Sequence, residues 1–279
     1  MMSPWKILAL VSLVWCVAVT EARAADGPVK ASLMADVSAI HSTRPFTIGL
    51  LLEIDPGWHI YWTNPGDSGL ATRVKFKLPD GFTVTPNPFP VPRRFQQAAN
   101  EVAYGYENAV LITALVTPPE NLHIGDEIAI EASASWLVCK QQCVPGKATA
   151  TLSLKVADHA NPANATAFEK YASVVTPASE HCPDLAEVKA TLDPRTHIAT
   201  ILVHWKNPAT GIELFPGADE AATVSGISVK KTEKDITPIE LKIEPVAGQT
   251  PASDRLTVLI GYHDKDGHSR GFETSVPLK

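Results

Sequence analysis

The sequence lacks the short motifs that mark several common classes of enzyme. It contains no nucleophile elbow, no phosphate-binding glycine loop and no dinucleotide fingerprint. Its 9 histidines are scattered, and no pair of them stands at metal-ligand spacing backed by carboxylates. These absences give no support for a serine hydrolase, a nucleotide-hydrolysing enzyme or a dinucleotide-dependent oxidoreductase. We therefore expect no cofactor and no resident metal.

Positive charge and long apolar runs are also scarce. The chain has 24 Lys and Arg against 30 Asp and Glu, a formal net charge of −6, and its basic residues form no cluster. This mild acidic excess gives no support for nucleic acid or an anionic membrane surface as a partner. Beyond the N-terminus, no apolar stretch approaches the roughly 20 residues of a membrane-spanning helix, so we expect neither a transporter nor a channel.

The N-terminus has the three-part layout of a secretory signal peptide. The basic residue Lys6 precedes an apolar run over residues 7–19, and an Ala-Arg-Ala sequence ending at Ala24 follows. We expect a signal peptide over residues 1–24, with cleavage after Ala24. The exported product would then have no inserted membrane segment, and it would fold where close cysteine pairs become oxidised.

The stretch over residues 29–156 has the pattern of β-strands. Apolar residues come in short runs such as RPFTIGLLLEI and AVLITALVT, which turn sequences such as DPG and NPGDSG separate. In TRVKFKL the apolar and basic residues alternate, which places Val74, Phe76 and Leu78 on one face. This spacing predicts an all-β sandwich or barrel.

The segment ADHANPANAT interrupts the strand pattern, and we expect a linker over residues 158–166. After it, AFEKYASVV predicts a short helix that Pro177 limits. Strand-like runs then resume in HIATILVHW, RLTVLIGY and GFETSVPL. We therefore expect a first domain over residues 25–157 and a second, smaller β-sandwich-like domain over residues 167–279.

The cysteines are the strongest candidates for chemistry. Three would remain after signal cleavage, Cys139, Cys143 and Cys182, and an odd count in an exported protein leaves at least one thiol outside an internal disulfide. Residues four apart on a straight strand lie about 13 Å apart, whereas a disulfide needs Cα atoms within about 4.4–6.8 Å. A bond between Cys139 and Cys143 therefore requires a sharp turn at or near a hairpin tip.

Three functions remain open for this close pair. As a structural staple it would contribute only roughly 2 kcal/mol, because the loop that it closes is short. A zinc or copper site would need further ligands, for which His181 and Cys182 are the candidates. A redox couple needs an accessible sulfur and a group that favours the thiolate; Lys140 is the candidate for this thiolate-tuning role.

Four ordered segments resemble a known family. The segments GWHIYWTNPGDSGLATRVKFKLPDGF, FPVPRRF, YGYENAVLITALV and WLVCKQQCVPGKA are together similar to the periplasmic N-terminal domain of the disulfide-interchange reductase DsbD. The similarity is strongest to the branch that includes the suppressor-of-copper-sensitivity reductases, in which a second β domain follows. The resemblance spans roughly residues 28–157.

The resemblance implies an immunoglobulin-like β-sandwich in which Cys139 and Cys143 cycle between dithiol and disulfide. Domains of this family receive electrons from a membrane thiol reductase. They pass them to periplasmic thioredoxin-like proteins, including disulfide isomerases and cytochrome c maturation factors. The chain would accordingly be a periplasmic component of a protein-disulfide reductase. The resemblance leaves open which cysteine attacks first.

The family also shields its cysteines with a loop that bears an aromatic residue. The corresponding segment here is expected to be a cap, with Phe95 as its lid. An ordinary proline-rich connecting loop is the alternative. The expected cap residues are Pro90, Val91, Pro92, Arg93, Arg94 and Phe95.

One departure from the family concerns the source of electrons. Family members usually continue into a membrane domain and a thioredoxin-like domain, and this sequence stops at Lys279. We therefore expect the electrons to come from a membrane thiol reductase in trans. Two alternatives remain open: a non-catalytic binding module with a structural disulfide, and a periplasmic copper-binding protein.

The segment GWHIYW invites comparison with a carbohydrate-stacking platform. Alternation places Trp58, Ile60 and Trp62 on one face and His59 and Tyr61 on the other. We interpret this segment as a strand with one face in the core.

Two further features have plain structural interpretations. The sequence DKDGH, over residues 264–268, is similar to the start of a calcium loop but lacks its later acidic ligand, so it predicts a hairpin turn. Cys182 is expected to be a partly buried free cysteine.

Overall fold

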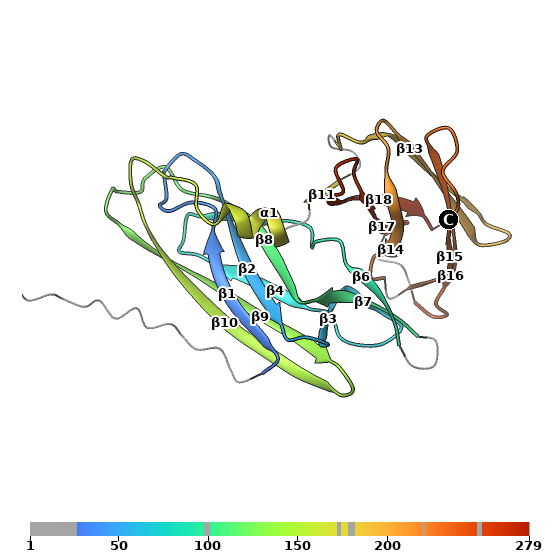
Figure 1. Cartoon of the computed structure of the whole chain (residues 1–279), viewed down its shortest axis with the longest axis horizontal. Helices are drawn as coiled ribbons and strands as arrows, with labels where there is room; N and C mark the ends of the chain where they lie inside the picture. The colour runs from blue at the N-terminus through green and yellow to red at the C-terminus, as the bar shows by residue number, and fades with distance from the viewer. Residues whose placement is uncertain are drawn as a thin grey trace, which may run out of the picture.

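The computed structural model describes residues 27–97, 101–171, 174–177, 182–219, 221–249 and 253–278. The predicted signal peptide lies outside these residues. Regular structure within them is almost entirely β, and the strands form two bodies, which are joined near a short helix (Figure 1). No helix in the described ranges is long and apolar enough to cross a membrane.

The first body, which we call the N-terminal sandwich, consists of two sheets. One sheet has the strand order β1 (Val29–Ala35), β2 (Phe46–Ile54), β8 (Ala109–Thr117) and β5 (Thr83–Pro86). The other has the order β10 (Cys143–Lys155), β9 (Glu127–Cys139), β3 (His59–Gly66), β7 (Val102–Glu107) and β6 (Arg93–Gln96), and β4 (Arg73–Lys77) also pairs with β9.

Alternation along β9 shows how this strand contributes to the core, whereas the inner strands β2 and β8 are buried over several consecutive residues. In β9, Ile128, Ile130 and Ala132 are buried while the residues between them are more exposed. In TRVKFKL the expected apolar face also packs inward, since Val74 and Phe76 contact the buried cluster between the sheets. The all-β sandwich that the sequence predicts is therefore confirmed.

The second body, the C-terminal sandwich, begins after the helix α1 (Ala165–Tyr171). Its first sheet has the order β11 (Val174–Pro177), β18 (Ser269–Pro277), β17 (Arg255–His263) and β14 (Thr210–Pro216). Its second sheet has the order β12 (Leu185–Asp193), β13 (Ile198–Trp205), β16 (Ile236–Pro245) and β15 (Ala222–Val229). A buried aliphatic and aromatic cluster lies between these two sheets.

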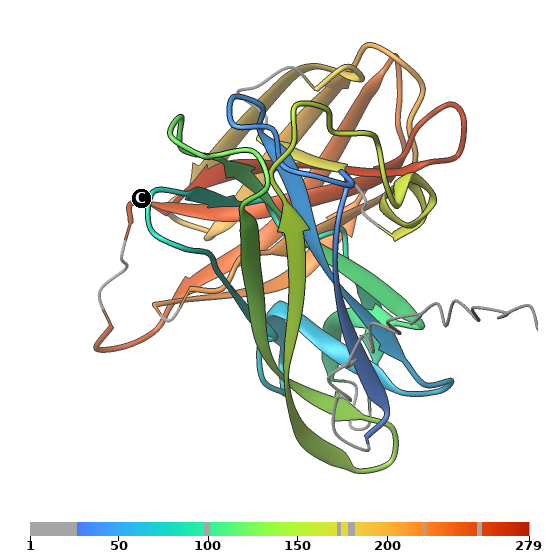
Figure 2. The ribbon, with the colours of Figure 1, turned by 90° about the vertical axis from the view of Figure 1, so that its left-hand side faces the viewer.

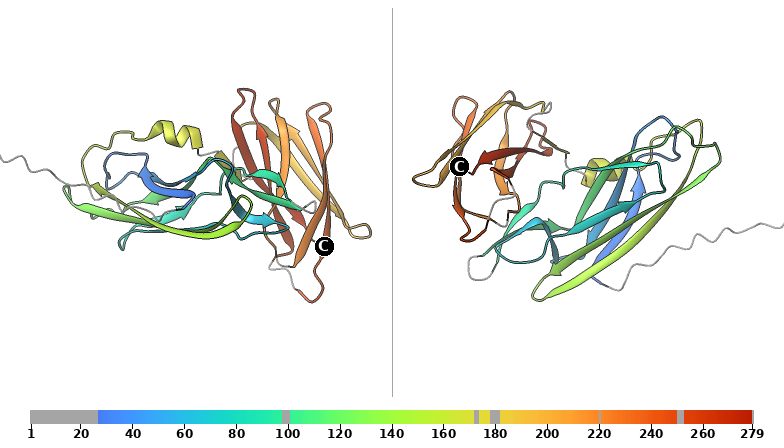
Figure 3. Two further views of the ribbon diagram at one scale, coloured as in Figure 1. Left: turned by 60° about the horizontal axis from the view of Figure 1, so that its bottom comes forward. Right: turned by 180° about the vertical axis from the view of Figure 1, so that it is seen from behind.

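The two sandwiches share a hydrophobic contact at the end of β14. The strands of the C-terminal sandwich stand across one end of the N-terminal sandwich (Figure 3). There the Phe215 ring, 1% exposed, makes edge contacts with Trp62 of β3 and Tyr104 of β7, at centroid distances of 6.2 and 5.6 Å. Asn64 Nδ2 donates a hydrogen bond of 2.8 Å to the Pro216 carbonyl. The contact therefore involves the same two strands, β3 and β7, that carry part of the candidate site.

Candidate functional site

The cysteine pair lies at the tip of the longest hairpin in the described chain. Strands β9 and β10 run side by side along one flank of the molecule (Figure 2), and Cys139 and Cys143 are direct partners in their register. The turn over residues 140–142 brings the two Cα atoms to 4.1 Å, and the sulfurs form a disulfide. The predicted hairpin placement of the pair is confirmed.

The two sulfurs have very different surroundings. Cys139 is 4% exposed and packs in a small cluster with Tyr61 and Ala103. Cys143, the first residue of β10, is exposed. An incoming thiolate can therefore reach Cys143, while Cys139 is covered by protein.

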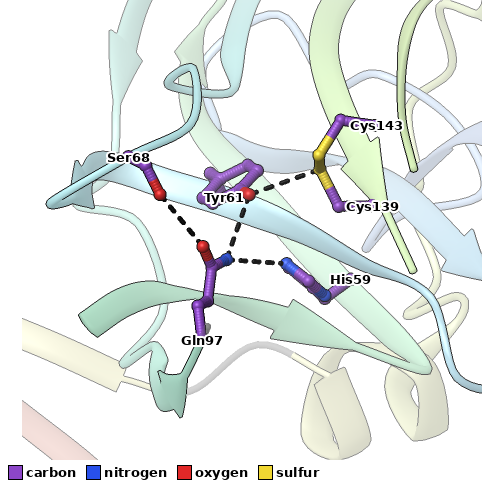
Figure 4. The surroundings of a disulfide bond; sticks show 6 residues. All are labelled: His59, Tyr61, Ser68, Gln97, Cys139 and Cys143. Atoms are coloured by element: carbon purple, nitrogen blue, oxygen red, sulfur yellow. Dashed lines mark hydrogen bonds between the residues drawn. A yellow bond between two sulfur atoms is a disulfide. The ribbon is translucent and has the colours of Figure 1, made fainter. Parts of the chain in front are cut away.

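A hydrogen-bond network leads from the buried sulfur into the sheet (Figure 4). The Tyr61 hydroxyl donates to Cys139 Sγ at 3.3 Å. Gln97 Nε2 donates to the Tyr61 oxygen at 3.1 Å, and Ser68 Oγ donates to Gln97 Oε1 at 2.9 Å. Because Ser68 holds the amide oxygen, the amide nitrogen faces Tyr61. The Tyr61 oxygen then accepts one hydrogen bond, and its own hydrogen remains directed at the sulfur.

Phe95 covers this network from the neighbouring strand. Strand β6 pairs with β7, with Phe95 opposite Ala103, and the Phe95 side chain packs against the cluster of Tyr61, Ala103 and Cys139. Its ring also stacks on His59, with centroids 5.0 Å apart and an interplanar angle of 23°. The described segment thus carries a half-buried aromatic side chain against the cluster that contains the buried cysteine.

His59 is half-buried beneath Phe95, and its burial has an electrostatic consequence. Desolvation lowers the pKa of His59 below its ordinary value of 6.5, and the carboxylate of Glu107 partly opposes this shift. The imidazole is therefore neutral at neutral pH, so that Nε2 can accept a hydrogen bond from Gln97 Nε2, 3.5 Å away.

Two comparisons with known proteins identify the fold of this site. Residues 26–155 match the family described as the N-terminal part of the thiol:disulfide interchange protein DsbD. Among solved structures, the N-terminal periplasmic domain of ScsB from Proteus mirabilis aligns with a TM-score of 0.56 and 17% identity, over 88% of this chain and 92% of that one.

The chain carries a DsbD N-terminal-like domain. The match covers the N-terminal sandwich, which has the immunoglobulin-like fold that the resemblance implies. The YadV chaperone also aligns, over 88% of this chain and 100% of that one, but at 8% identity and a TM-score of only 0.23. A comparison with curated protein sequences found no significant match.

The other expected cap residues of the DsbD N-terminal-like domain lie along the edge of the same sheet. Pro90 and Pro92 are buried, while Arg93 and Arg94 are exposed. The Pro90 carbonyl accepts a hydrogen bond of 2.6 Å from the buried hydroxyl of Tyr106. Desolvation raises the pKa of this hydroxyl well above its ordinary value of 10.0. Arg93 lies 3.6 Å from Glu107 in an exposed ion pair.

Lys140 lies in the hairpin turn, but its side chain extends toward the turn at Pro56 and Gly57. Its Nζ donates to the Pro56 carbonyl at 3.5 Å, and it is exposed. The described hydrogen bond to sulfur comes from Tyr61 instead. Thiolate tuning by Lys140 stays a prediction.

Sequence reasoning missed four residues that the DsbD N-terminal-like domain brings to its cysteines: His59, Tyr61, Ser68 and Gln97. The expected core face of GWHIYW is confirmed, because Ile60, Trp62 and Trp58 pack on the main cluster. Alternation had already placed His59 and Tyr61 on the opposite face. The signal in the sequence was that His59 and Tyr61, two polar aromatic residues, lie on the face of this strand opposite to the core face.

The remaining candidates lie in the C-terminal sandwich. DKDGH forms the turn between β17 and β18, as predicted. Its Asp264, Asp266 and His268 are close enough to share a metal ion, but Arg270 Nε already donates to Asp264 Oδ2 at 2.6 Å. This ion pair lowers the pKa of Asp264 and satisfies the carboxylate without a metal.

Cys182 is a free and buried thiol. Its Sγ lies 3.5 Å from the hydroxyl of Tyr262, and that hydroxyl also contacts Asp184 Oδ2 at 2.9 Å. It belongs to the core cluster of the C-terminal sandwich. The second residue of the candidate copper or zinc pair, His181, lies outside the described residues.

Replacing Tyr61 with Phe should make the reduction potential of the cysteine pair more negative by about 30 mV. A hydrogen bond to a charged group contributes about 1.5–3 kcal/mol, and 30 mV corresponds to about 1.4 kcal/mol for a two-electron couple. The substitution removes this bond from the Cys139 thiolate and so favours the disulfide. Equilibration with glutathione buffers measures the potential, with Tyr171→Phe as the matched control. An unchanged or more positive potential would contradict this role of Tyr61.

Proposed function

We propose that this protein relays reducing equivalents in the periplasm, through Cys139 and Cys143, from a membrane thiol reductase to thioredoxin-like proteins. The observation that carries the proposal is the asymmetry of the pair: one sulfur is exposed for attack, and the other is buried with a hydrogen-bond donor directed at it. Thiol–disulfide exchange needs both an accessible sulfur and a stabilised leaving group. A purely structural disulfide needs neither.

Reduction of the pair would begin with a thiolate of the reductase attacking Cys143 Sγ. A new intermolecular disulfide forms, the Cys139–Cys143 bond breaks, and Cys139 leaves with the electron pair as a thiolate. The Tyr61 hydroxyl, 3.3 Å away, donates to that thiolate. The second cysteine of the reductase then attacks its partner sulfur in the mixed disulfide and releases Cys143. Two electrons have moved, and the reductase is left as a disulfide.

Oxidation would follow the reverse course with a thioredoxin-like acceptor. The Cys143 thiolate attacks the disulfide of the acceptor, and one acceptor sulfur leaves as a thiolate. Cys139 then attacks Cys143 Sγ in the mixed disulfide, which restores the internal bond and releases the acceptor as a dithiol. Cys139 is suited to this resolving step because it is 4.1 Å from Cys143 in Cα separation and is covered from other disulfides.

The cap would control access to this chemistry. Phe95 packs against the cluster of Tyr61 and Cys139, so Cys139 would become accessible only when that ring is displaced, while Cys143 stays open to attack. Its stacking on His59 and the hydrogen bond from Gln97 to Tyr61 stabilise the closed position. We assign the lid role to Phe95 on this basis.

A measured reduction potential tests the proposal directly. We expect the pair to equilibrate between about −270 and −180 mV, the range of thioredoxins and disulfide isomerases, and above the −300 mV below which structural disulfides lie. The oxidised protein would be equilibrated with dithiothreitol and glutathione buffers, and its thiols counted after alkylation and mass spectrometry. Reduction only below −300 mV, together with failure of the reduced protein to reduce an oxidised thioredoxin-like protein, would favour a binding module with a structural disulfide.

A further inference from the structure

The segment that leads into the cap contacts the C-terminal sandwich. Val91 lies between the buried residues Pro90 and Pro92, directly before β6, which carries the Phe95 lid. Val91 also packs against the hydrophobic cluster that includes Phe215 and Leu259 of the C-terminal sandwich. The cap is therefore joined at its base to a body that is remote from it in sequence.

Val91 occupies a socket that two glycines form. Gly261 of β17 and Gly271 of β18 are direct partners across the strand pair. A Cβ placed on Gly261 would lie 2.5 Å from Val91 Cγ1, and one on Gly271 would lie 2.8 Å from Val91 Cγ2. One methyl group of Val91 thus lies over each glycine, on a part of the sheet that has no side chains of its own.

Backbone conformation does not account for these two glycines. Neither has a positive φ, so any residue could adopt their conformation, and glycine inside a strand usually destabilises it. What glycine provides at both positions is space. We call the pair, with the Phe215 and Leu259 side chains beside it, the Val91 socket.

The segment between the socket and the lid is stiff. Pro90 and Pro92 restrict the backbone on both sides of Val91, and a β-branched valine has few rotamers with which to avoid a collision. Phe95 follows four residues later, in a strand that is already paired with β7. The same segment lines an open cleft of about 560 Å³ at Pro90, Val91 and Arg93.

We propose that the C-terminal sandwich is the anchor of the cap: the Val91 socket holds the base of the cap and so sets how often Phe95 uncovers Cys139. Val91, Gly261 and Gly271 are then positioning residues for thiol–disulfide exchange. This inference rests on the proposed relay function and gives the second sandwich a part in it.

The rate at which iodoacetamide alkylates Cys139 at 25 °C, in the reduced full chain with Cys143→Ala and Cys182→Ala as the parent background, tests the anchor. Each buried methyl-sized group stabilises the closed cap by about a factor of four, so Val91→Ala, which removes two, should raise the rate about 15-fold. Gly261→Ala should raise it as well, because the new Cβ displaces Val91. Val229→Ala, a valine on β15 that is 36% exposed, should react at the rate of the parent.

A double variant separates anchoring from general destabilisation. Gly261→Ala in a Val91→Ala background should add little further increase, because the Val91 methyl group at 2.5 Å is gone and the nearest remaining atoms are Phe215 Cε2 at 3.3 Å and Val91 Cβ at 3.7 Å. The proposal would be overturned if the rate increases of Val91→Ala and Gly261→Ala multiplied in the double variant. It would also be overturned if both single variants reacted at the rate of the parent. A purely structural role would lower the unfolding midpoint and leave the rate at 25 °C unchanged.

The outcomes also separate the anchor from the relay. If the wild-type protein exchanges electrons with a thioredoxin-like protein and both socket variants are alkylated at Cys139 at the rate of the parent, the relay stands and the anchor is wrong. If the socket variants react faster and no exchange with thioredoxin-like proteins occurs, the anchor stands and the relay is wrong.

Discussion

A Cys139→Ala variant should accumulate a covalent complex with a thioredoxin-like partner, whereas a Cys143→Ala variant should accumulate none. Cys143 is exposed, so it is the sulfur that a partner reaches first. In Cys139→Ala the resolving thiol is missing and the mixed disulfide on Cys143 persists. In Cys143→Ala the remaining thiol is 4% exposed and lies beneath Tyr61 and Phe95. Both variants should lose electron transfer completely, because each removes half of the couple.

Trapping can be measured on non-reducing gels, with mass spectrometry of the linked peptides, after mixing each variant with an oxidised thioredoxin-like protein. Cys182→Ala is the matched control, since it removes a buried thiol of the C-terminal sandwich and should behave like the wild type. Equal trapping by the two single variants would contradict the assignment of Cys143 as the attacked sulfur. Trapping through Cys139 alone would reverse it.

Phe215→Ala should be among the most destabilising substitutions in the chain, at about 3–5 kcal/mol, the usual cost of removing a buried phenylalanine ring. The ring is 1% exposed and lies between Trp62 and Tyr104, so its loss leaves a cavity where the two sandwiches meet. The effect should extend beyond β14, because β3 and β7 lose a neighbour on the core side of the sheet that holds the cysteines.

Guanidinium unfolding measures this loss, and hydrogen exchange locates it in β3, β7 and β14. Phe82→Ala serves as the comparison, because that phenylalanine is only partly buried at the edge of a core cluster; it should cost considerably less. Phe215→Leu should retain most of the stability. A Phe215→Ala variant no less stable than Phe82→Ala would show that the sandwiches do not depend on this contact.

The network around Cys139 could not be predicted from the sequence, because its members are far apart in the chain. Tyr61 and Cys139 are separated by 78 positions, and Gln97 and Tyr61 by 36. Nothing in the local pattern of either segment specifies which side chain of one meets which side chain of the other. The pairing of β6 with β7 and of β3 with both β7 and β9 brings them together.

The cap could be predicted from the sequence only in part. Its position followed from a resemblance, and Phe95 packs against the cluster that contains the buried cysteine, while its role as a lid stays a prediction. Its contact with the C-terminal sandwich left no local signal, since Val91 is 170 residues from Gly261 in the numbering and both lie in ordinary strand or loop sequence. A glycine pair that serves as a socket looks the same in sequence as a glycine pair that merely weakens a strand.

Local alternation and spacing were enough to specify the β class, the inward face of TRVKFKL and the hairpin tip at Cys139 and Cys143, because strand periodicity and disulfide reach depend on neighbours in the chain. Tertiary packing alone makes Cys139 the buried sulfur, aligns Tyr61 with it and inserts Phe215 beside β3. Those features depend on strand register and on contacts between distant segments, and burial of apolar surface across the whole fold stabilises them.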